Sequence, residues 1–326
     1  MDKIDIAILR EMSQPQAMLP AKMDLPSSYR EIAKRIGSSP GTVRNRVSKL
    51  YTSGVLTGSS VYINPTILGL KGAAFAVDVS RHVPKDSALE RLKKDGSVLF
   101  IHNFRGSLVG ISFVYRDYPT ETVERFLEIC EAEGGALSRI EYPSCKISMG
   151  DQEWQIIEYL SRGLFRSYSQ LASELKMSVR TLLRRLSKLR TTGAILSTPA
   201  LDYKAIRGGL ATDIIVTFVT QESKLELKEK IMQLIGEYAI FIGDGTDYVV
   251  YNLILPSVTT ANELASSFRN LKGVRMVRTE LVEEHIDLTS NLRSYLKMSA
   301  KNRSGDSSRH ALTAAVPLQK HSEKQA

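Results

Sequence analysis

The sequence predicts an α+β fold made of two similar halves, in each of which three helices precede strands and helices in the order βαββαβ. The first observation is an internal repeat. Residues 28–54 align without a gap with residues 167–193, and 11 of the 27 positions are identical where chance gives about two. The second is apolar spacing typical of helices in and before the repeat. The third is strand-like alternation after it, as in residues 73–79.

Three helices are predicted to begin each half. They span residues 2–12, 29–36 and the segment behind Ser39 in the first half, and residues 151–160, 168–175 and the segment behind Ser178 in the second. Ser39 and Ser178 are favourable N-cap residues. The third helix of each half carries an apolar stripe at helical spacing, formed by Val43, Val47 and Leu50 and by Leu182, Leu186 and Leu189. We expect each stripe to face the core of its three-helix unit.

Local signals mark the ends of these helices. Ser-x-x-Glu at residues 28–31 and Ser-x-x-Gln at residues 167–170 predict capping boxes at the start of the second helices. Gly54 and Gly193 are expected to end the third helices, and the β-type residues that follow favour a short wing-like hairpin in each half. Residues 13–27 contain three prolines and are expected to form a surface loop.

The periodicity then changes to strand, helix, two strands, helix and strand. The predicted elements are 73–79, 87–94, 98–104, 108–115, 121–133 and 137–142 in the first half, and 212–219, 225–235, 239–242, 248–255, 260–271 and 274–282 in the second. This order is that of a ferredoxin-like domain, an antiparallel sheet with both helices on one face. The predicted domains are residues 1–62, 63–148, 149–200 and 201–296, followed by a basic disordered tail, 297–326.

The positive charge is concentrated in three places. Of the formal charge of +9, residues 28–58 carry +5, residues 167–197 carry +5 and the tail carries +4, which leaves −5 for the rest of the chain. Two matched basic helix pairs are typical of helix-turn-helix units that bind double-stranded DNA, in which the later helix enters the major groove and basic side chains neutralise phosphates. The alternative is a solvated basic surface.

The candidate DNA-contacting residues lie on or next to these helix pairs. They are Arg30, Ser39, Gly41, Thr42, Arg44, Asn45, Arg46, Lys49, Ser178, Arg180, Thr181, Arg184, Arg185 and Lys188. Arginine pairs with guanine and asparagine with adenine, so Arg44, Asn45, Arg180 and Arg184 are candidate base readers. Arg46, Lys49, Arg185 and Lys188 lie nearer the apolar stripe and are candidate phosphate contacts.

Other function classes receive little support from the sequence. Cys130 and Cys145 lack the spacing of a metal or disulfide motif, and no cofactor or metal is expected. There is no run of about 18 apolar residues and no signal-peptide pattern, which predicts a cytoplasmic protein.

Several segments together resemble one known family. They are residues 4–9 (IDIAIL), 28–37 (SYREIAKRIG), 39–47 (SPGTVRNRV), Gly54-Val55-Leu56, Asn64-Pro65 and Leu68-Gly69. In these residues the chain resembles the Lrp/AsnC (feast/famine) transcription regulators of prokaryotes, and the resemblance covers some 290 residues as two copies. It implies two units, each a winged helix-turn-helix followed by a ligand-sensing RAM domain of the βαββαβ type.

The resemblance has further implications. Family members pair through their RAM sheets, so one chain is expected to form an intramolecular pseudo-dimer, with homodimers or larger assemblies as further options. Because the reading helices differ, we expect an asymmetric operator with half-sites about 34 Å apart. The family's effector turn corresponds to Gly243, Asp244, Gly245 and Asp247, where an amino acid or similar ligand is expected; the alternative is an acidic hairpin turn without a ligand.

Two other functions remain open at this point. Siroheme decarboxylases share the architecture, and His102-Asn103-Phe104-Arg105 is similar to a His-Asn-aromatic segment of that family, in which a histidine can act as a general acid. No second histidine follows, and the second half has Phe241-Ile242-Gly243-Asp244 instead, so we predict that the protein is not an enzyme. The other alternative is an architectural protein that binds DNA without sequence preference.

Overall fold

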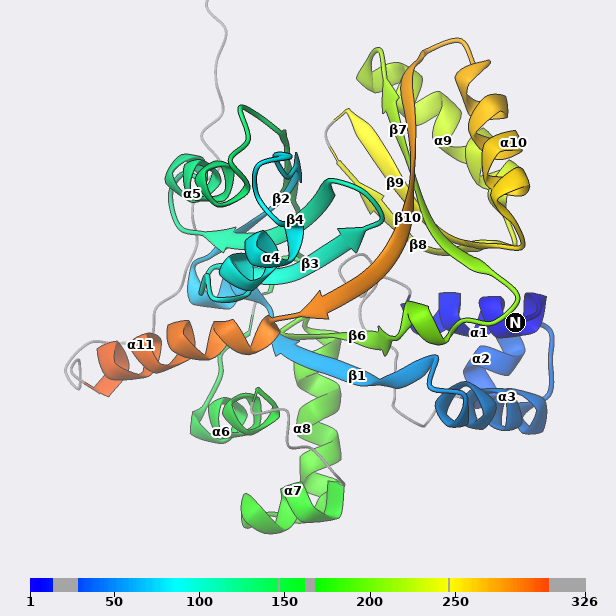
Figure 1. The fold of residues 1–326 in the computed structure, drawn as a ribbon. Coiled ribbons are helices and arrows are strands. Elements are labelled where there is room, and N and C mark those ends of the chain that lie inside the picture. The colour runs from blue at the N-terminus through cyan, green and yellow to red at the C-terminus, as the bar shows by residue number, and fades with distance from the viewer. Residues whose placement is uncertain (14–28, 146, 162–167, 246, 305–326) are drawn as a thin grey trace, which may run out of the picture.

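The two halves have the same order of elements, and the fold is α+β as predicted (Figure 1). The computed structural model describes residues 1–13, 29–145, 147–161, 168–245 and 247–304. The predicted capping boxes involve Ser28 and Ser167, which lie outside the described residues, as does nearly all of the predicted loop 13–27.

A three-helix unit begins each half. Its helices are α1 (Lys3–Ser13), α2 (Tyr29–Arg35) and α3 (Pro40–Thr52) in the first half, and α6 (Asp151–Leu160), α7 (Tyr168–Glu174) and α8 (Val179–Thr191) in the second. Both predicted N-caps are present: Ser39 Oγ accepts a hydrogen bond from the Thr42 amide, and Ser178 Oγ accepts one from the Thr181 amide. Gly54 and Gly193 follow α3 and α8 with positive φ values of 77° and 70°, which L-residues with a side chain disfavour.

Two four-stranded ferredoxin-like sheets join into one eight-stranded antiparallel sheet. Their elements are β2 (Lys71–Asp78), α4 (Lys85–Lys93), β3 (Val98–Phe104), β4 (Leu108–Tyr115), α5 (Thr120–Cys130) and β5 (Ala136–Ile140), then β7 (Leu210–Phe218), α9 (Gln221–Ile235), β8 (Ala239–Asp244), β9 (Tyr248–Leu255), α10 (Val258–Arg269) and β10 (Val274–Asp287). The strand order is β5-β2-β4-β3-β10-β7-β9-β8. Helices α4 and α5 cover the first sheet and α9 and α10 the second, each over its own apolar core.

The long strand β10 holds the two sheets together. Its first part, Val274–Leu281, pairs with β7, and its second part, Val282–Asp287, pairs with β3. The prediction ended this strand at Val282. It was too short because the last residues are held by hydrogen bonds to the other half, which local alternation does not reveal.

The prediction of a wing hairpin in each half was wrong. Each three-helix unit is followed by one strand, β1 (Leu56–Ile63) or β6 (Ile195–Leu201), and the two pair with each other in a two-stranded antiparallel sheet. Among the described residues, each of these strands pairs with the other half and not with its own, so the backbone groups are satisfied across the halves. The 3-10 turns η1 (Pro65–Leu68) and η2 (Tyr203–Ala205) then lead into the large sheet.

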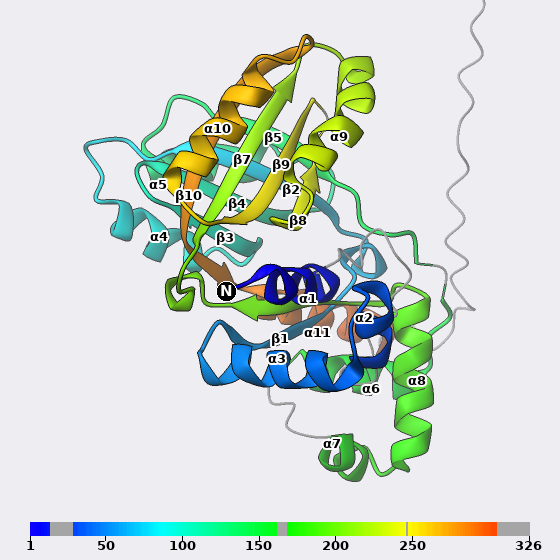
Figure 2. The same ribbon diagram turned by 90° about the vertical axis from the view of Figure 1, so that its right-hand side faces the viewer.

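This crossing places each three-helix unit against the sheet of the other half. The core around Ile8 and Leu9 of α1 includes Ile240 and Ile254 of the second sheet, and α1 lies beside β8 (Figure 2). The core around α6 and α8 includes Leu99 and other residues of the first half. The halves are therefore not independent domains placed in chain order.

The chain continues into a helix where disorder was predicted. After η3 (Thr289–Asn291), helix α11 spans Leu292–Ser304, so the prediction was wrong for residues 297–304. Leu292 and Leu296 are buried in the core that contains α6 and α8, and the Arg293 guanidinium donates to the Ser161 carbonyl oxygen at 2.6 Å. Residues 305–326 lie outside the described residues.

Candidate nucleic-acid interface

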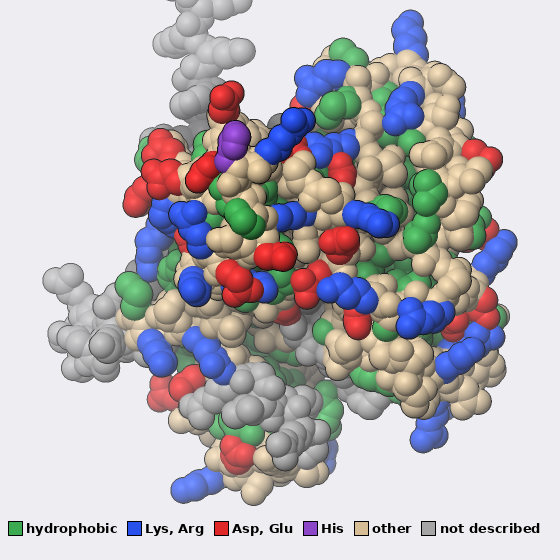
Figure 3. Space-filling model, viewed as in Figure 1, with side chains coloured by type: hydrophobic (Ala, Val, Ile, Leu, Met, Phe, Trp, Pro, Cys, Tyr) green, Lys and Arg blue, Asp and Glu red, His purple; other side chains and the backbone are tan. Residues whose placement is uncertain are grey.

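Helices α3 and α8 each present one apolar and one polar face. The predicted stripes are buried: Val43, Val47 and Leu50 in α3, and Leu182, Leu186 and Leu189 in α8. On the opposite faces, Gly41, Arg44, Asn45 and Lys49 of α3 and Arg180, Arg184 and Lys188 of α8 are exposed, as is Arg30 on α2. Lys and Arg side chains project from the lower right of the molecule, where α1–α3 lie (Figure 3). Both helices thus offer basic groups to solvent, and α3 also offers the side-chain amide of Asn45.

Four of the predicted contact residues cap the reading helices. Ser39 Oγ lies 3.0 Å from the Thr42 amide nitrogen and 2.9 Å from Thr42 Oγ1, and Ser178 and Thr181 repeat this arrangement at 3.1 and 2.9 Å. Their hydroxyl groups therefore fix where each helix starts. Gly41 and Arg180 are the second residues of α3 and α8, so they lie in the first turn of each helix.

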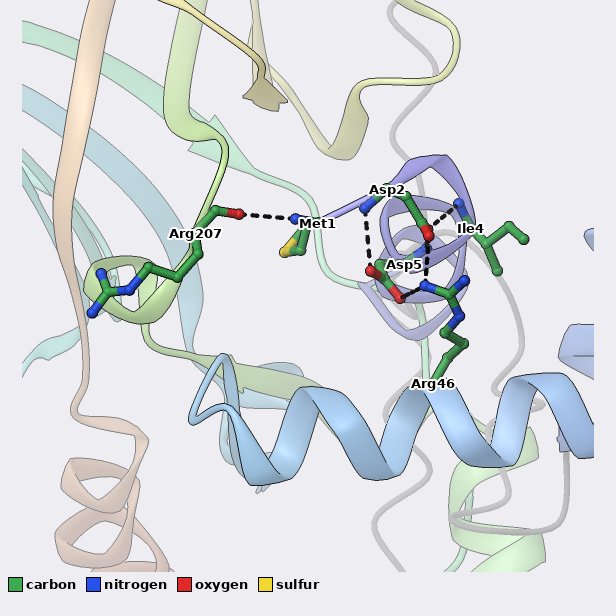
Figure 4. A network of polar contacts seen from close by, with 6 residues as sticks. All are labelled: Met1, Asp2, Ile4, Asp5, Arg46 and Arg207. Atoms are coloured by element: carbon green, nitrogen blue, oxygen red, sulfur yellow. Dashed lines mark hydrogen bonds and ion pairs between the residues drawn. The ribbon is translucent and has the colours of Figure 1, made fainter.

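Arg46, a predicted phosphate contact, is partly exposed and forms ion pairs with two acids. Its guanidinium lies 2.5 Å from Asp2 Oδ2 and 3.3 Å from Asp5 Oδ1, and both acids are at the start of α1 (Figure 4). Asp2 Oδ1 also accepts hydrogen bonds from the amides of Ile4 and Asp5, so it caps α1. The structure thus assigns Arg46 to holding α3 against α1.

Arg185 repeats this arrangement in the second half. Its guanidinium pairs with Glu153 of α6, a carboxylate that is only 5% exposed. Burial tends to raise the pKa of Glu153, but Arg185 and backbone amides outweigh it, so the pKa lies below its usual value. Arg46 and Arg185 are equivalent in the repeat, and each forms an ion pair with an acid of the first helix of its own unit.

The unit containing α1 is also tied to the second sheet domain. Lys3 Nζ lies 2.7 Å from Glu237 Oε2, and the Arg10 guanidinium donates to the Gly236 carbonyl oxygen at 2.6 Å. The Met1 amino group donates to the Arg207 carbonyl oxygen at 2.8 Å (Figure 4). These contacts fix the orientation of α3 relative to the large sheet through α1.

The predicted effector turn is already occupied by side chains of the protein. Lys224 and Lys228 of α9 both form ion pairs with Asp244, and Lys224 also donates to the Gly245 carbonyl oxygen. Burial raises the pKa of Asp244, but the two lysines outweigh it and lower the pKa. Lys224 lies outside the predicted helix 225–235, because α9 begins at Gln221, four residues before the predicted start, whereas Lys228 lies within it.

The remaining predicted turn residues are less enclosed. Asp247 pairs with Arg275 at 2.7 Å on the surface, and Gly243 lies in β8 opposite Val250. The corresponding turn of the first half is closed in a similar way, since Lys85 Nζ donates to the carbonyl oxygens of Phe104 and Gly106. In both halves a lysine from the first helix of the sheet domain therefore holds this turn.

His102 lies at the junction of the two sheets. It is paired in register with His285 of β10, and the two imidazole rings are 4.6 Å apart. Burial lowers the pKa of His102 to about 3 and that of His285 to about 4. Both rings are therefore uncharged at neutral pH, which counts against His102 as the proton donor of an enzyme.

A buried carboxylate of the second sheet was not predicted at all. Asp213 of β7 is 3% exposed and accepts a hydrogen bond from the Asn252 side-chain amide at 2.6 Å. Burial is the main cause that raises the pKa of Asp213 to about 7, with a smaller contribution from Glu280. The alternation of β7 predicts that residue 213 points away from the helices, but not that it would be buried there beside Asn252 and Glu280.

Comparisons with known proteins agree with this helix arrangement. The family described as winged helix-turn-helix DNA-binding matches residues 24–57. The HTH-type transcriptional regulator Ptr1 of Methanocaldococcus jannaschii is 31% identical over 106 residues, which are 32% of this chain and 66% of Ptr1. An uncharacterized HTH-type transcriptional regulator of Pyrococcus abyssi is 34% identical over 102 residues, 31% of this chain and 68% of that protein. The regulatory protein AsnC of Escherichia coli is 36% identical over 69 residues, 21% of this chain and 45% of AsnC.

The chain is thus a helix-turn-helix protein, in which the β1–β6 ribbon stands in place of a wing hairpin, and it belongs to the Lrp/AsnC family of HTH-type regulators. It spans about two thirds of the length of Ptr1 and less than half of that of AsnC. Among solved structures, the siroheme decarboxylase NirDL is similar with a TM-score of 0.49 and 14% identity, over 92% of this chain and all of that one. No helix within the described ranges is long and apolar enough to cross a membrane.

Proposed function

We propose that the protein is a sequence-specific DNA-binding transcription regulator in which α3 and α8 read two different half-sites. The observation that carries this proposal is the pair of capped helices with buried apolar faces and exposed, unlike reading residues: Gly41, Arg44 and Asn45 in α3, and Arg180, Leu183 and Arg184 in α8. Arginine and asparagine side chains at the N-terminal part of such a helix match base edges in the major groove.

Two strand pairings support the proposal that one chain supplies both reading units of a pseudo-dimer. The β1–β6 ribbon joins the two three-helix units, and the β3–β10 pair joins the two sheets. In this proposal the ribbon fixes how far apart the half-sites lie in adjacent major grooves. Lys49 and Lys188, exposed at equivalent positions of α3 and α8, contact DNA phosphates.

The geometry supports DNA binding better than effector binding at the turn of residues 243–247. An amino-acid ligand whose amine bound Asp244 would have to displace the ammonium groups of Lys224 and Lys228. Asp247 is likewise paired, with Arg275. We therefore propose that this turn is primarily structural.

Replacing Lys49 or Lys188 with alanine tests the phosphate contacts. We expect either variant to weaken binding to every duplex by a similar factor and to reduce the slope of log affinity against log salt by about 1, because one phosphate contact is lost. Arg44→Ala should instead weaken binding mainly to preferred sequences, by about 1–3 kcal/mol. Fluorescence anisotropy over a salt series measures both effects.

Lys230→Ala is the matched control, because Lys230 is an exposed lysine on α9, away from both reading helices. It should leave affinity and salt slope almost unchanged. Sequence-specific reading would be contradicted if the protein bound preferred and random duplexes with equal affinity and if Arg44→Ala and Lys49→Ala had the same effect on both. That result would favour an architectural protein.

A further inference from the structure

The aligned reading positions of α3 and α8 differ most where Arg44 corresponds to Leu183. The repeat that aligns residues 28–54 with 167–193 also aligns Pro40 with Val179 and Asn45 with Arg184. Helix α3 therefore places a charged side chain at the position where α8 places an apolar one.

Leu183 is unusual within its own helix. The other leucines of α8 are at most 7% exposed, whereas Leu183 is 43% exposed and Val179, one turn earlier, is 37% exposed. Residues four positions apart lie on the same helix face, so these two side chains form a small apolar strip beside the row of Arg180 and Arg184.

The core of the three-helix unit does not need this strip. Helix α3 packs with the same buried stripe although it has Pro40 and Arg44 at the aligned positions. The apolar strip is thus exposed among basic side chains on the face that the proposed function turns toward DNA. The basic side chains around the strip favour binding of a polyanion such as DNA, and the strip itself favours contact with an apolar group of that polyanion.

In the DNA major groove the apolar group is the 5-methyl group of thymine, while the other base edges present hydrogen-bond donors and acceptors. We propose that Leu183, supported by Val179, packs against the methyl group of a thymine in the α8 half-site, next to guanines that Arg180 and Arg184 read. This inference rests on the proposed function and adds the base that distinguishes the α8 half-site from the α3 half-site.

The test replaces individual thymines by uracil, which removes only the methyl group. A preferred duplex is first selected from random DNA. The α8 half-site is then identified as the base pairs whose substitution weakens binding of the unchanged protein but not of Arg184→Ala. For the unchanged protein, uracil at one thymine of that half-site should weaken binding about fourfold, or about 0.8 kcal/mol at 1.4 kcal/mol per tenfold. Leu183→Ala should bind the thymine and uracil duplexes equally.

Several outcomes would overturn the inference. They are an α8 half-site without thymine, equal binding of thymine and uracil duplexes by the unchanged protein, and a thymine preference that persists in Leu183→Ala. Because Leu183 is exposed, the thermal unfolding of Leu183→Ala should match that of the unchanged protein, which separates lost recognition from lost folding. Failure to select any preferred duplex would instead contradict the proposed function itself.

Discussion

Replacing Arg185 with alanine is expected to destabilise the protein by about 2–3 kcal/mol. For a basic residue on helix α8, sequence alone would predict only a loss of DNA affinity. The reason for the destabilisation is that Glu153 would be left buried without its partner. Removing one partner of a fully buried ion pair costs about 3–5 kcal/mol, and the value is lower here because Arg185 is partly exposed. Thermal and denaturant unfolding measure the loss.

Two further variants show whether the ion pair is the cause. Lys188→Ala on the same helix should lower DNA affinity without a comparable loss of stability, because Lys188 is exposed. Adding Glu153→Gln to Arg185→Ala should restore much of the stability, since no buried charge then remains unpaired. If Arg185→Ala unfolded like the unchanged protein and only bound DNA more weakly, the phosphate role first predicted for Arg185 would be correct.

Replacing Asp213 with asparagine is expected to stabilise the protein at pH 8. The pKa of Asp213 is raised to about 7 in the folded state, against about 3.9 for an unperturbed aspartate. The protonated carboxyl therefore contributes stability that is complete below about pH 4 and is lost as the pH rises through about 7. At pH 8 a buried charge remains, and asparagine removes it while keeping an oxygen that can accept from Asn252.

The difference between Asp213→Asn and the unchanged protein is the quantity to measure. It should be smallest at and below about pH 4 and should then grow by at most about 4 kcal/mol up to pH 8, since one pKa unit corresponds to about 1.4 kcal/mol. His102 and His285 have lowered pKa values, so they add stability that is lost as the pH falls from about 6.5 toward 4 in both proteins, and they cancel in the difference. A difference that does not change with pH would contradict the raised pKa.

Much of the fold follows from local sequence signals. Strands β3, β4 and β9 and helix α6 have the predicted bounds, and the Ser39 and Ser178 caps are present. What the sequence did not reveal is pairing over long distances: β1 with β6, the end of β10 with β3, and α11 against α6. The first two pairings join the two halves, and the third joins the beginning and the end of the second half. Periodicity reports only which side of an element is apolar.

In the candidate site, too, solvent exposure could be predicted from local sequence but ion pairing could not. Exposure of Arg44, Arg180 and Arg184 could be predicted from helical spacing, because each lies opposite a buried stripe. The ion pairs of Arg46 and Arg185 could not, because the acids come from the first helix of each unit, whose register on the third helix depends on tertiary packing. A repeated acid at Asp5 and Glu153, facing a repeated arginine, was the available signal.

Selection of bound duplexes from random DNA is the measurement that tests the central claim most directly, namely that α3 and α8 read two unlike half-sites. We expect one enriched motif with two different half-sites about one helical turn apart. Arg44→Ala should lose sequence preference in one half-site and Arg184→Ala in the other. No enriched motif, or a perfect palindrome that is unaffected by replacing Arg180 and Arg184 together, would contradict the account.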